Sequence, residues 1–179
     1  VNALIFKLID VANVLVPRFI VSLLFAISSF FAYKIASRFL SPFWAFVAVL
    51  LGFSGLVSRE HAYGHIFGFC GAMIALWGGL SYIYEKNINN LGVAGFASGM
   101  ALTAQPLPVG VLSAFMMICL MAYEYCFRDS NRKLYAYLVF SIGLLFLPAV
   151  GVLYFYWHDA FLVYLKSLFP MFLGHENHP

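Results

Sequence analysis

Long apolar runs separated by short polar breaks make up most of this chain. A membrane-spanning helix needs about 20 apolar residues, with a range of roughly 17 to 25, and we expect about six such segments here. They cover residues 19–39, 43–57, 66–84, 91–104, 109–125 and 134–156. The strands of a transmembrane barrel alternate apolar and polar residues, whereas these runs do not. The pattern therefore predicts an all-α, polytopic transmembrane helix bundle with interfacial helices.

The segments on either side of these spans are shorter or more polar. We divide the single transmembrane domain, 1–179, into an N-terminal segment 1–16, a six-span bundle 17–156, an interfacial helix 157–174 and a polar tail 175–179. The N-terminal segment contains Lys7 and Asp10, and it suits an interfacial helix or the end of an earlier span. The chain opens on Val1 without a leader-like pattern. We therefore expect a processed chain or a portion of a longer one.

The composition of the chain excludes several classes of protein. Hydrophobic residues make up 64% of it and charged residues only 9%, whereas a soluble domain has roughly 25% charged residues. The net charge of +3 comes without a basic stripe, so we expect membrane lipid and not nucleic acid as a partner. Cys70, Cys119 and Cys126 lack the spacing of a metal site or a disulfide framework. They are predicted to be small hydrophobic residues within the membrane.

The charged residues sort unequally onto the two faces that six spans would create. One face holds six of the ten lysines and arginines, namely Lys34, Arg38, Lys86, Arg128, Arg132 and Lys133. The positive-inside rule makes this face cytoplasmic. All five histidines fall on the other face, which is therefore predicted to be non-cytoplasmic. The groups that can titrate, ligate or bind phosphate gather there.

Two polar loops follow the two shortest spans. Residues 58–65 come after the span 43–57, and residues 103–108 end the span 91–104. Short spans can sit in a thinned bilayer, or their loops can dip into the membrane. Dipping loops are tolerated only where protein or a water-filled cavity surrounds them, so they would share one wet cavity. The alternatives are a solvated interfacial loop for the first stretch, and a packing helix with a stiff turn for the second.

These two loops supply the candidate site residues. Glu60 is the candidate catalytic residue, and the candidate substrate-binding residues are Arg59, His61, Tyr63, His65 and Gln105. The planar fork of Arg59 suits phosphate oxygens, and Glu60 could accept a proton or hold a divalent cation. On a helix, His61 and His65 would share a face. Two histidines without a third ligand do not make a standard metal site, and their positions do not suit haem. No metal site is predicted, and a divalent cation at Glu60 stays an open alternative.

Four short motifs occur along the chain in the order that is typical of one enzyme superfamily. They are Pro17-Arg18-Phe19, Tyr33-Lys34-Ile35-Ala36, Ser58-Arg59-Glu60-His61-Ala62-Tyr63 and Gly99-Met100-Ala101-Leu102-Thr103-Ala104-Gln105-Pro106. In this order the chain resembles the GT-C-type integral-membrane glycosyltransferases, such as protein mannosyltransferases and aminoarabinose transferases. The resemblance covers about three quarters of the chain, from Pro17 to Tyr156.

The resemblance implies transfer of a sugar from a polyprenyl phosphate on the non-cytoplasmic face. Arg59 matches the lumenal arginine of the family and would hold the phosphate, and Tyr63 matches its aromatic position. Gln105 stands where the family often has a basic residue. The family's catalytic carboxylate lies in a first lumenal loop that Asp10 does not match, which leaves Glu60 as a substitute. We expect the central portion of such an enzyme, or a relative without its own catalytic base.

A second hypothesis is a non-catalytic membrane subunit of a larger complex. The unmatched catalytic loop and the aromatic content of 19% suit such a packing role, in which other membrane subunits are the partners. A transporter and a redox subunit are weaker alternatives. The absence of an inverted repeat from the sequence counts against the transporter.

Overall fold

The computed structural model describes residues 15–57, 63–104 and 133–162, together with single positions between 111 and 126. Five helices are described, and the described part of the chain contains no strand. The helices are α2 (Leu15–Ala36), α3 (Pro42–Val57), α4 (Tyr63–Glu85), α5 (Ile88–Ala104) and α7 (Lys133–Trp157). The all-α class predicted from the apolar runs is therefore confirmed.

Each described helix coincides with a predicted span. The segments predicted at 43–57 and 134–156 match α3 and α7 to within one residue at each end. Helices α4 and α5 each begin three residues earlier than predicted, and α2 is shifted toward the N-terminus. The described positions within 109–125 are helical, but most of that segment lies outside the described residues. So do residues 1–14 and most of the interfacial helix predicted at 157–174.

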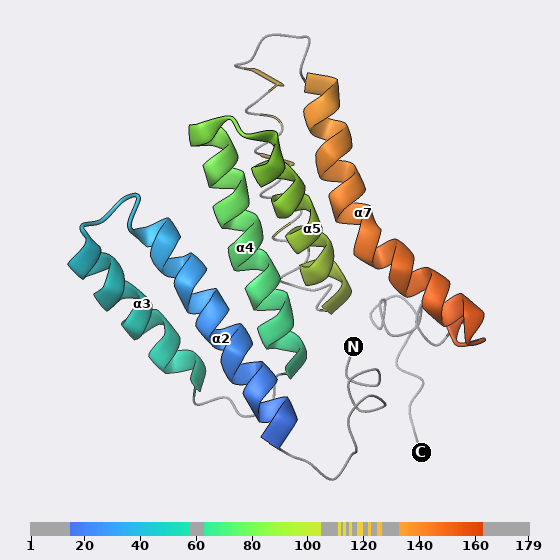
Figure 1. The fold of residues 1–179 in the computed structure, drawn as a ribbon, viewed down its shortest axis with the longest axis horizontal. Helices are drawn as coiled ribbons and strands as arrows, with labels where there is room; N and C mark the ends of the chain where they lie inside the picture. The colour runs from blue at the N-terminus through green and yellow to red at the C-terminus, as the bar shows by residue number, and fades with distance from the viewer. Residues whose placement is uncertain are drawn as a thin grey trace.

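The helices form an antiparallel arrangement with α5 between α4 and α7 (Figure 1). Helices α2 and α4 run in one direction, and α3, α5 and α7 run in the other. One end of the bundle, which we call the hairpin end, holds residues 34–42 and 81–90. The opposite end holds the first turns of α2 and α4 and the last turns of α3, α5 and α7.

Local sequence signals place the two turns at the hairpin end. Ser41 precedes α3 and its carbonyl accepts the amide hydrogen of Ala45 at 2.9 Å, while Pro42 occupies the first helical position, where its missing N–H costs nothing. Helix α4 ends because Lys86 adopts a left-handed conformation, with φ of 57°. The side chain of Asn87 then caps α5 by accepting the amide hydrogen of Asn89 at 3.0 Å.

Small residues allow α4, α5 and α7 to pack with their backbones almost in contact. A methyl group added at Gly71 would lie 2.7 Å from the carbonyl oxygen of Ala97, and one at Gly143 would lie 2.9 Å from that of Gly92. Close approach at small residues is a common way for helices to associate in membranes. The core of these three helices consists of Tyr82, Leu91, Ala94, Ala136 and Phe140.

Aromatic side chains join α2 and α3 to α4. The ring of Phe53 on α3 packs edge-on against Phe25 of α2 at 4.9 Å and against Phe69 of α4 at 5.6 Å between centroids. Nearer the hairpin end, Phe31 of α2 lies 5.1 Å from Trp77 of α4. Such ring pairs add roughly 0.5–1.5 kcal/mol each beyond their buried area. They hold α2 and α3 beside the tightly packed helices.

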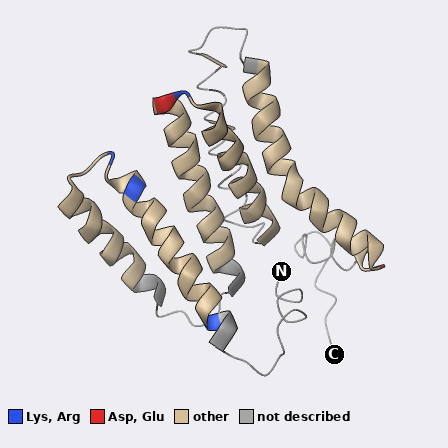
Figure 2. Ribbon diagram, in the orientation of Figure 1, with Lys and Arg blue, Asp and Glu red and all other residues tan. Residues whose placement is uncertain are grey.

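Three of the described helices are long and apolar enough to cross a membrane. The segments are Arg18–Ala36, Ile66–Glu85 and Leu134–Trp157. The described charged residues lie at or near the ends of the helices (Figure 2). Large apolar side chains are exposed on α2, α3 and α7. This distribution suits a lipid environment. Helices α3 and α5 are shorter, so the count of six spans stays a prediction.

Candidate functional site

The two polar loops that hold the candidate residues flank helix ends at the opposite end of the bundle. Helix α4 begins at Tyr63, and α5 ends at Ala104, next to it (Figure 1). The contact of Gly71 with Ala97 and Ala101 fixes this proximity, because Ala101 lies within one turn of the end of α5. The loops that adjoin these ends therefore start from the same end of the bundle.

The structure places the candidate residues only in part. Arg59, Glu60, His61 and Gln105 lie outside the described residues. Tyr63 and His65 lie in the first turn of α4, and only their backbone is described. The shared cavity and the roles of these side chains therefore stay predictions. What the structure adds is the common origin of the two loops.

In the second polar loop, 103–108, the described residue Thr103 makes a side-chain hydrogen bond. Its hydroxyl donates to the carbonyl oxygen of Gly99 at 2.8 Å, within α5. Such a bond to the preceding turn satisfies the hydroxyl locally and tends to bend a helix. Nearby, Ser113 donates to Ser98 at 2.9 Å in a buried contact. That bond holds Ser113 against α5.

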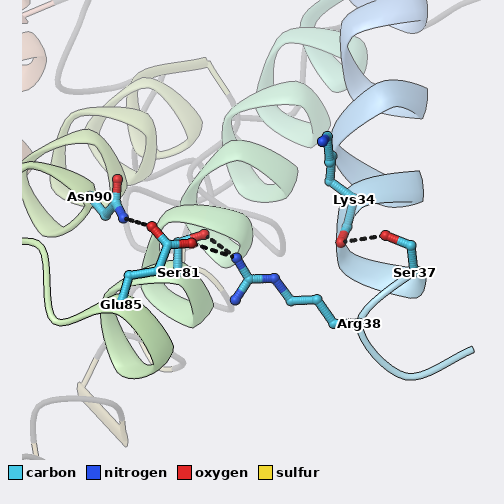
Figure 3. A network of polar contacts seen from close by, with 6 residues as sticks. All are labelled: Lys34, Ser37, Arg38, Ser81, Glu85 and Asn90. Atoms are coloured by element: carbon cyan, nitrogen blue, oxygen red, sulfur yellow. Dashed lines mark hydrogen bonds and ion pairs between the residues drawn. The ribbon is translucent and has the colours of Figure 1, made fainter.

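A second polar cluster, which sequence reasoning missed, joins three helices at the hairpin end (Figure 3). Nη2 of Arg38 donates to the hydroxyl of Ser81 at 2.7 Å and lies 3.2 Å from Oε1 of Glu85. The side-chain amide of Asn90 donates to the other carboxylate oxygen of Glu85 at 3.0 Å. The guanidinium also lies over the ring of Tyr84 at 5.1 Å. The cluster links the C-terminal ends of α2 and α4 to the start of α5.

Arg38 should contribute more to stability than Glu85, although they form one ion pair. Ser81 is fully buried, so replacing Arg38 with alanine removes a partner from a buried hydroxyl and should cost about 1–3 kcal/mol. Glu85→Gln should cost about 0.2–1 kcal/mol, because the carboxylate is 55% exposed and water screens the pair. Unfolding of both variants in detergent measures the difference, with Lys34→Gln as the control. Equal losses for Arg38→Ala and Glu85→Gln would contradict this ranking.

The described residues contain no group of three or more histidine, cysteine or acidic side chains that could hold a metal ion. Cys70 is buried, whereas Cys119 and Cys126 are exposed, and all three are free thiols. That all three lie within the membrane as small hydrophobic residues stays a prediction. The alternative of a divalent cation at Glu60 lies outside the described residues.

Comparison of the chain with protein-family models, curated proteins and solved structures found no match.

Proposed function

We propose that this chain is the membrane-embedded part of a glycosyltransferase of the GT-C type, and that it transfers a sugar from a polyprenyl phosphate to an acceptor. The opposite end of the bundle holds the reaction site, on the non-cytoplasmic side of a bundle with six spans. Arg59, His61, Tyr63, His65 and Gln105 bind the donor, and Glu60 is the base.

One observation supports this proposal most directly. The start of α4 and the end of α5 lie together, which brings the origins of both polar loops to one place. Loops that come from neighbouring helix ends can enclose a lipid phosphate, and irregular backbone at membrane depth requires such a protein-lined cavity. The apolar outer faces of α2 and α7 offer the hydrocarbon contact that a polyprenyl chain needs.

The proposed reaction is a displacement at the anomeric carbon. The acceptor hydroxyl oxygen attacks this carbon and forms the new glycosidic bond, while the bond to the phosphate oxygen breaks. Polyprenyl phosphate leaves with the bonding electron pair, and the carboxylate of Glu60 takes the proton of the hydroxyl. The guanidinium of Arg59 stabilises the negative charge that builds up on the departing phosphate.

Removing the charge of Arg59 tests the phosphate-binding part of this proposal. Arg59→Ala should weaken binding of undecaprenyl phosphate about ten- to a hundredfold, because a hydrogen bond to a charged group contributes about 1.5–3 kcal/mol. Titration of the lipid into purified protein in nanodiscs, followed by native mass spectrometry, measures the affinity.

Arg18→Ala is the matched control, since Arg18 is an exposed cation at the same end of the bundle. It should leave the affinity within about twofold of the unmodified chain, because a single exposed charge contributes little. Unchanged binding by Arg59→Ala, or equal losses for both variants, would contradict a specific phosphate site at the polar loops.

A non-catalytic membrane subunit is the second candidate function, and the outer face of α7 favours it. Exposed apolar side chains recur there at helical spacing, at Leu134, Leu138, Ile142, Leu145 and Leu153. Such a stripe fits a partner helix as well as it fits lipid. Absence of polyprenyl phosphate binding, together with stable copurification of a second membrane protein, would favour this candidate over the enzyme.

A further inference from the structure

The hairpin end carries an excess of positive charge. Lys34, Arg38 and Lys86 lie there, and Glu85 is the one described acidic residue in the same region (Figure 2). Three cations and one carboxylate leave a net charge of +2 on these described residues. We call Lys34, Arg38 and Lys86 the basic cluster. Two of its members, Lys34 and Lys86, have exposed side chains.

The side chains of the basic cluster are held in place by neighbouring rings and polar groups. Nζ of Lys34 lies 5.6 Å from the ring centroid of Phe30, and Nζ of Lys86 lies 6.0 Å from that of Tyr82. Arg38 makes its contacts with Ser81 and Glu85 through Nη2 (Figure 3). A guanidinium has further donors on Nη1 and Nε, which suit a second oxyanion. Three cations that come from two neighbouring helices are thus partly ordered before an anion arrives.

Exposed aromatic residues adjoin the basic cluster. Phe39 lies in the turn directly after Arg38, and Phe43 and Trp44 form the first turn of α3; their exposures are 63%, 67% and 61%. Aromatic side chains of this kind concentrate where hydrocarbon meets the headgroups of a bilayer. A ligand at this place therefore meets cations and hydrocarbon-compatible rings together. That combination favours an amphipathic anion over a small soluble one.

We propose that the basic cluster binds the anionic headgroup of a phospholipid, whose acyl chains lie against the apolar faces of α2 and α3. The site is independent of the sugar-transfer site, which belongs to the opposite end of the bundle. Each lysine or arginine near an anionic membrane surface strengthens the attraction about fivefold. The lipid bridges α2 to the start of α5 and so adds to the link that Arg38 and Glu85 make.

Quenching of Trp44 by brominated lipids tests this site. The chain has three tryptophans, and replacing Trp77 and Trp157 with phenylalanine leaves Trp44, at the hairpin end, as the single tryptophan. In nanodiscs of mixed lipids, dibrominated phosphatidylglycerol should quench Trp44 several-fold more strongly than dibrominated phosphatidylcholine at equal mole fraction. Lys34→Gln combined with Lys86→Gln should abolish most of this preference, and Lys34→Arg with Lys86→Arg should keep it.

Arg18→Gln is the matched control. Like Lys34→Gln it removes one positive charge from α2, but at the end of the bundle opposite to the hairpin end. It should leave the preference for phosphatidylglycerol unchanged. Equal quenching by both lipids in the chain that keeps Trp44 as its single tryptophan would overturn the proposal, as would an equal loss of preference when Arg18→Gln is added. Reversal of the preference by millimolar glycerol phosphate would assign the cluster to soluble anions and would overturn the lipid site as well.

Discussion

Gly95→Ala is expected to destabilise the bundle by about 1–3 kcal/mol, the usual cost of forcing an extra carbon into a packed interior. A Cβ at this position of α5 would collide with the carbonyl oxygen of Phe140 and would lie 3.2 Å from the amide nitrogen of Leu144, both on α7. These are backbone atoms, so α7 as a whole must move to make room. For the variant to be destabilised, the free energy lost by moving α7 has to exceed the helix propensity that alanine gains over glycine, about 1 kcal/mol.

Two other glycines provide a graded control for this prediction. A Cβ at Gly52 of α3 meets nothing within 4 Å, and one at Gly92 meets only the side chain of Val139, at 3.4 Å. Gly52→Ala should therefore be neutral or slightly stabilising, and Gly92→Ala should fall between the two. Unfolding by titration with sodium dodecyl sulfate, followed by circular dichroism, measures all three variants. If Gly95→Ala were as stable as Gly52→Ala, the close approach of α5 and α7 would be wrong.

The positions of the helices could be predicted from sequence because apolar runs and their breaks are local signals. Ser41 with Pro42 marks the start of α3, and the run of Glu85, Lys86 and Asn87 marks the turn between α4 and α5. Each of these residues acts within one helical turn of its own position. The early starts of α4 and α5 show the limit of this reasoning, since Tyr63 and Ile88 extend their helices through polar residues that had been assigned to loops.

The pairing of helices could not be predicted in the same way. Arg38 and Ser81 lie 43 positions apart, and each had the features of an ordinary residue at a helix end. Their contact depends on α2 and α4 running side by side in the same direction, which no local pattern specifies. The same holds for Gly95, whose neighbours on α7 no local pattern specifies. Its importance comes from the backbone of α7 that lies against it.

The candidate site, too, could be predicted from sequence only in part. The prediction that loops 58–65 and 103–108 belong together rested on two short spans, and the described ends of α4 and α5 do lie side by side. Whether Arg59 faces Gln105 depends on how the loops fold over those ends. That arrangement is set by packing between distant segments, and polar residues in a loop carry little information about it.

Glu60→Gln is expected to lower the rate of sugar transfer about 10²- to 10⁴-fold, the usual contribution of a positioned general base. Glutamine keeps the size of the side chain and its hydrogen-bonding oxygen, but it cannot take a proton from the acceptor hydroxyl. Binding of the polyprenyl phosphate donor should stay within a few-fold, because the phosphate is assigned to Arg59. A transfer assay compares the unmodified protein with Glu60→Gln in nanodiscs. It measures kcat and KM separately and should show the loss in kcat.

The carboxylate at the other end of the bundle provides the control. Glu85→Gln removes the same charge from the hairpin end, where Glu85 pairs with Arg38, and it should leave kcat unchanged. Loss of kcat in both variants would point to a general effect of stability on activity. Full activity of Glu60→Gln alongside weakened donor binding by Arg59→Ala would keep the phosphate site and assign the base to another carboxylate. Full activity and full binding in both loop variants would remove the reaction from loop 58–65, because neither of the two charged residues proposed to act there would then contribute.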